Sequence, residues 1–92
     1  MTAAQAIADG YAALEAGRWA QARAAFEAAL AERETPEARD GLASVLWWLG
    51  ETRASVEHSE RAYAGFRRSG DPVRAAMTAL NLCITSISNY GN

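Results

Sequence analysis

A repeat of 33 residues limits the folds that are open to this chain. Gly17 and Gly50 are 33 positions apart, and so are Ala29 and Ala62. A period in the low thirties with two helices per unit is typical of stacked helical hairpins, because one hairpin cannot bury its apolar face alone. The 92 residues have room for one small domain of about two and a half such units.

Capping residues, prolines and glycines mark the ends of five expected helices. Thr2 can cap the first, while Thr35-Pro36 and Asp71-Pro72 each combine a cap with a proline at the first helical position. Short connections favour antiparallel neighbours, and the absence of period-two alternation predicts no strand, so the predicted fold class is all-α. The expected helices run over about 3–16, 19–33, 35–49, 52–69 and 71–90.

Apolar residues at helical spacing predict which face of each helix is buried. The expected inward stripes are Trp19, Ala22, Phe26, Ala29 and Leu30 on the second helix; Leu42, Val45, Leu46 and Leu49 on the third; Val56, Ser59, Tyr63 and Phe66 on the fourth; and Val73, Met77, Leu80, Ile84 and Ile87 on the fifth.

Charge and composition exclude several classes of function. All nine basic residues are arginine, which indicates a GC-rich bacterial genome, and the net charge is −2. No basic patch is available to neutralise phosphates, so direct nucleic-acid binding is not expected. No apolar run approaches the ~20 residues of a membrane span, and no signal-peptide pattern begins the chain. We therefore expect no membrane partner and a cytoplasmic location.

The segment Gly17-x-Trp19-x-x-Ala22-x-x-x-Phe26-x-x-Ala29-Leu30 resembles the second half of a tetratricopeptide repeat. Gly10 corresponds to the family's small residue in the first helix. The resemblance implies antiparallel helical hairpins in a right-handed solenoid. It divides the single domain 1–92 into repeat one (3–35), repeat two (36–69) and an unpaired or capping helix (71–90).

A second resemblance concerns the segments 46–50 and 62–72. They are similar to helical-repeat regions of large actinobacterial LuxR-type transcriptional regulators. This resemblance implies that the chain is part of such a regulator, outside its DNA-binding helix-turn-helix, or a stand-alone relative.

No residue set suggests catalysis or metal binding. His58 is the only histidine and is expected to be an exposed helix residue, because a metal site needs several ligands on one face. Cys83 lies beside the apolar stripe of the last helix and is expected to be a small buried hydrophobe, since no base can be placed next to it. We therefore predict a protein that is not an enzyme and holds no metal or cofactor.

Trp47 points about 150° and Trp48 about 110° away from the inward stripe of the third helix, so the two cannot share one stripe. One or both must be covered by another helix or left for a partner. The tetratricopeptide resemblance implies that the first helix of each hairpin lines a concave groove. The groove residues implied are Ile7, Tyr11 and Leu14; Glu37, Asp40, Ser44 and Trp47; and Thr78, Asn81, Thr85 and Ser88.

These residues predict a protein–protein interaction module that binds a protein or peptide, because aromatic anchors in a recess are typical of contact sites. One alternative is a structural oligomerisation or spacer segment without a peptide ligand, in which a homodimer forms through the last helix. A third reading is a small-molecule sensor with an enclosed apolar pocket. The residues expected to mediate self-association are Leu80, Cys83, Ile84 and Ile87.

Overall fold

The computed structural model describes the backbone of residues 2–90 and the side chains of residues 2–83. Within residues 2–90 the chain forms five α-helices and no strand, which confirms the all-α prediction. The helices are α1 (Ala3–Glu15), α2 (Trp19–Glu32), α3 (Pro36–Trp48), α4 (Thr52–Arg68) and α5 (Pro72–Tyr90).

Side-chain caps begin α1, α3 and α5, the three helices for which the sequence predicted a capping residue. Thr2 and Gln5 form a capping box, with the Thr2 hydroxyl accepting from the Gln5 amide at 3.2 Å and the Gln5 side chain accepting from the Thr2 amide at 2.8 Å. Thr35 accepts from the backbone amide of Ala38, and Asp71 from that of Arg74. These bonds satisfy donors that the first helical turn leaves without partners.

Glycines in the left-handed conformation end three of the helices. Gly17, Gly50 and Gly70 have φ values of 76°, 80° and 74°. In each case the amide of the following residue bonds back to the carbonyl five positions earlier, as Arg18 does to Ala13 at 2.8 Å. This is the Schellman arrangement, and it reverses the chain within a few residues.

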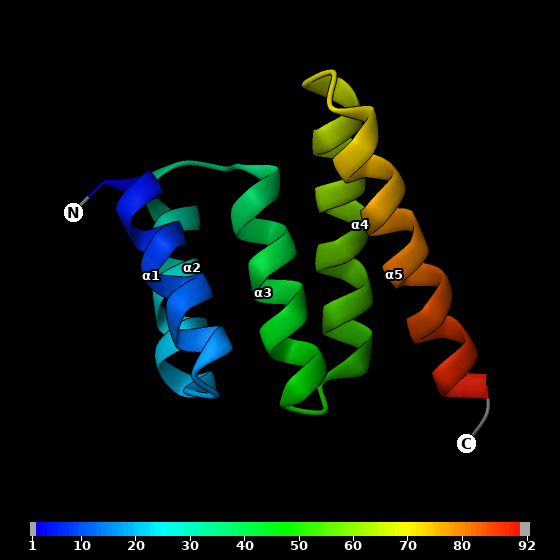
Figure 1. Cartoon of the computed structure of the whole chain (residues 1–92), viewed down its shortest axis with the longest axis horizontal. Helices are drawn as coiled ribbons and strands as arrows, with labels where there is room; N and C mark the ends of the chain where they lie inside the picture. Colours follow the sequence, from blue (N-terminus) through cyan, green and yellow to red (C-terminus); the bar gives the residue numbers. More distant parts are fainter. Residues whose placement is uncertain (1, 91–92) are drawn as a thin grey trace.

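The short turns produce two antiparallel hairpins that lie side by side. Figure 1 shows α1 paired with α2 and α3 paired with α4, with α5 packed along α4 at the far end. Contacts of α3 with both α1 and α2 join the hairpins to each other. The extra helix α5 therefore has a neighbour in α4 on one side.

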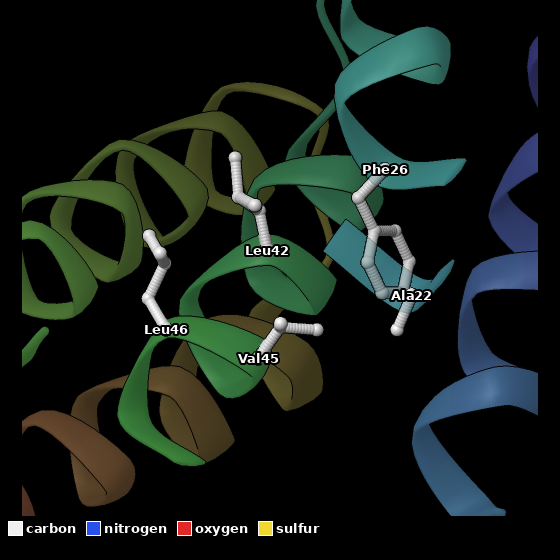
Figure 2. Close-up of a cluster of buried hydrophobic side chains, with 5 residues drawn as sticks. All are labelled: Ala22, Phe26, Leu42, Val45 and Leu46. Atoms are coloured by element: carbon white, nitrogen blue, oxygen red, sulfur yellow. The ribbon is translucent and has the colours of Figure 1, made fainter. Parts of the chain in front are cut away.

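Phe26 is the centre of the core between the hairpins. Its side chain is fully buried and belongs to a cluster with Ala22, Leu42, Val45 and Leu46, drawn in Figure 2. α2 thus supplies the ring, and α3 supplies the aliphatic side chains around it.

Glycines on α1 and α3 make room for the Phe26 ring. A Cβ at Gly10 would lie 2.7 Å from ring atoms of Phe26, and a Cβ at Gly41 would lie closer still. The family-based interpretation of Gly10 as a small contact residue agrees with this geometry. The equivalent role of Gly41 was not predicted.

The buried face of α4 is rotated slightly from the predicted stripe. Ser55, Ala62 and Phe66 are buried, while Ser59 and Tyr63 are only half-buried. Ser55 can occupy an interior position because its hydroxyl donates to the Ala43 carbonyl at 2.7 Å. A small serine with a satisfied hydroxyl lets α4 approach α3 closely.

The predicted inward stripe of α5 is wrong for its first three residues. Val73, Met77 and Leu80 are 68%, 61% and 61% exposed, and the buried residues among the described side chains of this helix are Ala75 and Thr78. Ala75 packs in a cluster with Ala62 and Phe66 of α4. Small side chains allow close helix approach, so α5 turns its small face toward α4 and its large apolar residues outward. Ile84 and Ile87 lie outside the described side chains.

Candidate binding recess

A recess of about 210 Å³ opens between α3, α4 and α5. Four of the predicted groove residues line it: Asp40, Ser44 and Trp47 from α3, and Asn81 from α5. The structure adds four lining residues that the sequence did not indicate. These are Ala43, Trp48, Ser55 and Ser59. We call this site the Trp47 recess.

A second recess of about 280 Å³ adjoins the first and shares Asp40 and Asn81 with it. It extends to Tyr11 on α1 and to Arg74 and Met77 on α5. Together the two recesses form a surface that runs from α1 past α3 to α5. We call the second site the Arg74 recess.

Two tryptophans at the end of α3 have different surroundings. Trp47 is 37% exposed and borders the Trp47 recess. Trp48 is 61% exposed and stacks on Trp19 of α2, with ring centroids 5.3 Å apart and planes 2° from parallel. The sequence indicated that the two could not share one stripe, and only the structure shows which neighbour each has.

A polar cluster connects the two recesses. The Tyr11 hydroxyl lies 2.9 Å from Asp40 Oδ2 and 3.2 Å from the Glu37 carbonyl oxygen, and it can donate to either. The Arg74 guanidinium lies 3.6 Å from the Glu37 carboxylate and 3.7 Å from that of Asp71. Arg74 thus partly balances the acidic residues of α3, a compensation that the sequence analysis missed. The only feature of the sequence that indicated this role was the spacing of three residues between Asp71 and Arg74.

Burial is the main cause of the shifted pKa values of Tyr11 and Asp40. Burial, then the nearby Asp40 carboxylate, raises the pKa of the Tyr11 hydroxyl. Burial also raises the pKa of Asp40, while the hydrogen bond from Tyr11 and the charge of Arg74 oppose that rise. The recess therefore presents a carboxylate that is poorly hydrated and attracts hydrogen-bond donors.

Several predicted groove residues do not line the Trp47 recess. Ile7 and Leu14 are half-buried and pack on the core clusters. Thr78 is only 3% exposed, and its hydroxyl donates to the Arg74 carbonyl at 2.9 Å, but it is one of the residues that line the Arg74 recess. It therefore lies at the inner wall of that recess on α5. Thr85 and Ser88 lie outside the described side chains.

His58 is not the exposed residue that the sequence predicted. It is half-buried, and its Nδ1 lies 2.9 Å from Arg39 Nη1. Arg39 also makes two hydrogen bonds to the Glu34 carboxylate, at 2.6 and 2.8 Å. Because arginine can only donate, Nδ1 of His58 must accept, which requires the neutral ring. This chain of contacts links the α2–α3 connection and α3 to α4.

Cys83 is exposed, so its prediction as a buried hydrophobe is wrong. Among the described residues, no three histidine, cysteine, aspartate or glutamate side chains cluster in a way that could hold a metal ion. In the part of the chain that the structure describes, no helix has the length and apolar character needed to cross a membrane.

The recesses offer contacts suited to a polar chain with an aromatic or aliphatic anchor. Trp47 supplies an apolar wall, Ser44 and Ser59 supply hydroxyls, Asn81 an amide and Asp40 a carboxylate. The volume of about 210 Å³ is below the roughly 300–1,000 Å³ of small-molecule sites. This size and the polar lining favour one inserted side chain over an enclosed ligand.

Comparison of the chain with known proteins found no matching family model, no matching curated protein and no matching solved structure.

Proposed function

We propose that this protein binds a segment of another protein across the two recesses. The observation that carries the proposal is the Trp47 recess itself, in which a partly exposed tryptophan lies among polar side chains from α3, α4 and α5. Aromatic residues in a recess surrounded by hydrogen-bonding groups are typical of energetic hot spots at protein interfaces.

The charges of the surface restrict the partner. Asp40 on α3 lines both recesses, and Glu37 lies beside them, 3.6 Å from Arg74, which is also near Asp71. An acidic peptide tail would meet these carboxylates, so we expect a neutral or basic segment. A basic side chain near Asp40 would also gain the hydrogen-bonding capacity of a poorly hydrated carboxylate.

Selection from a phage-displayed library of random peptides tests this proposal. Synthetic copies of the enriched peptides should bind the wild-type protein in calorimetry and change its tryptophan fluorescence. Trp47→Ala and Ser44→Arg, which remove the aromatic wall and fill the recess, should each weaken binding by about tenfold or more, the loss expected for a hot-spot residue.

Ala28→Arg is the matched control, because Ala28 is exposed on α2, outside the residues that line either recess. It should leave peptide affinity unchanged. Selected peptides that bind Ser44→Arg as tightly as the wild type would contradict the proposal, and so would a selection that yields no binding peptide.

We further infer that the hairpins are tetratricopeptide-like repeats in a right-handed solenoid, within a cytoplasmic bacterial transcriptional regulator. Support comes from the paired hairpins, the signature from Gly17 to Leu30 and the glycine at position 10 against Phe26. The gene tests the regulator part of this inference. A helix-turn-helix encoded further along the same reading frame supports it, whereas a stop codon directly after Asn92 contradicts it.

A further inference from the structure

α5 carries an exposed apolar face on the side that does not pack on α4. Val73, Met77 and Leu80 are each more than 60% exposed. Ala75 and Thr78, the buried residues among the described side chains of this helix, are centred about 160° around the helix from these three. The large apolar side chains therefore lie opposite the face that packs on α4. Scattered exposed hydrophobes are common on proteins, but a single helical stripe of them is not.

The spacing of this face is that of a coiled-coil seam. Val73, Met77 and Leu80 follow one another at steps of four and three, and the sequence continues the same steps to Ile84 and Ile87. Alternating steps of three and four place apolar residues at the a and d positions of a heptad, where each side chain packs between residues of a facing helix. The occupant that fits this face is therefore another helix.

The residues on either side of the seam indicate which helix would pack against it. Ala76 and Cys83 beside it are exposed and uncharged, Asn81 on the other side is neutral, and Arg74 is the only charged residue from 73 to 83. Arg74 already lies near Glu37 and Asp71. A charged amphipathic helix would find no complementary charges here, whereas a second copy brings the same neutral flanks and no like-charge repulsion.

We propose that this protein forms a two-fold symmetric dimer in which α5 packs against α5 of a second copy. A two-fold arrangement pairs the same stripe on both subunits and removes both apolar faces from water. Met77 belongs both to this face and to the lining of the Arg74 recess, whereas Val73 and Leu80 line neither recess, so the effect of Leu80→Arg separates dimerisation from peptide binding.

Sedimentation equilibrium of the full chain from micromolar to millimolar concentration tests the dimer. The wild type should change from monomer to dimer within this range. Leu80→Arg should weaken the dimer by at least about tenfold, because each dimer carries the buried charge twice. Met77→Arg should have the same effect, and circular dichroism should show that both variants keep the helical content of the wild-type monomer.

Leu49→Arg is the matched control, since Leu49 is also an exposed leucine, at 40%, but lies at the end of α3. It should dimerise like the wild type, and so should Ser44→Arg in the Trp47 recess. The proposal is overturned if the wild type stays monomeric at millimolar concentration. It is also overturned if Leu80→Arg dimerises as strongly as Leu49→Arg, because the contact would then lie elsewhere.

Discussion

Phe26 and Gly41 form a contact with no spare room, because the Phe26 ring occupies the space that a Cβ at Gly41 would need. Replacing a helix-interior glycine by alanine ordinarily stabilises a helix by about 0.5–1 kcal/mol. Here Gly41→Ala should instead lower the free energy of unfolding by about 1–3 kcal/mol, the cost of overpacking a core. Urea denaturation measures the change. An increase in the free energy of unfolding would contradict the close contact between Phe26 and Gly41.

A second variant separates this overpacking from other effects of the alanine. In a Phe26→Leu background the ring is gone, so Gly41→Ala should cost less than it does in the wild type. An equal cost in both backgrounds would show that the Phe26 ring is not what excludes a side chain at position 41.

His58 should make folding stability depend on pH. Burial first, and then the positive charges of Arg39 and Arg61, lower the pKa of His58 below its ordinary value of 6.5. Protonation also removes the Nδ1 lone pair that accepts from Arg39. The neutral ring therefore contributes stability that is present above pH 6.5 and is lost as the pH falls through the lower folded-state pKa.

Chemical denaturation of the wild type and His58→Gln at a series of pH values checks this expectation. Glutamine cannot titrate but can still accept a hydrogen bond from Arg39. The wild type should lose more stability than the variant on acidification from pH 7 through this window. Parallel curves for the two proteins would contradict the assigned role. The comparison cancels the titration of Glu34 and Asp40, whose shifted pKa values act in opposite directions at lower pH.

The end of α3 and the start of α2 are joined by the stack of Trp48 on Trp19. Offset or parallel aromatic pairs contribute about 0.5–1.5 kcal/mol beyond the area that they bury. A double-mutant cycle of Trp19→Ala and Trp48→Ala should yield a coupling energy in that range. The cycle of Trp19→Ala with Trp47→Ala is the control and should yield almost no coupling energy. Equal coupling energies in the two cycles would mean that Trp19 does not distinguish Trp48 from Trp47.

The stability of the whole chain should depend on Phe26 far more than on Trp47. Phe26 is fully buried between both hairpins, so Phe26→Ala should cost about 3–5 kcal/mol. That is a large share of the roughly 5–15 kcal/mol of a typical domain. Trp47 is 37% exposed beside a recess, and Trp47→Ala should cost only about 1 kcal/mol. Thermal melts show which variant loses more stability. A larger loss for Trp47→Ala than for Phe26→Ala would contradict the core described above.

Part of the binding surface could be predicted because a helix has a fixed angular period. Asp40, Ser44 and Trp47 lie at steps of four and three on α3, so they share a face whichever way the helix packs. Ser59, Trp48 and Arg74 could not be assigned in this way. They join the two recesses only through the packing of α3, α4 and α5 against one another.

Local interactions were sufficient to define the five helices of this protein. The caps at Thr2, Thr35 and Asp71 and the left-handed glycines bond to residues only a few positions away, so the sequence carries their full description. The facing of α5 was decided by tertiary structure. Hydrophobicity favoured burial of Met77 and Leu80, but close packing on α4 favoured the small residues Ala75 and Thr78. Which preference prevails depends on the space left beside a neighbouring helix, and a single helix does not specify that space.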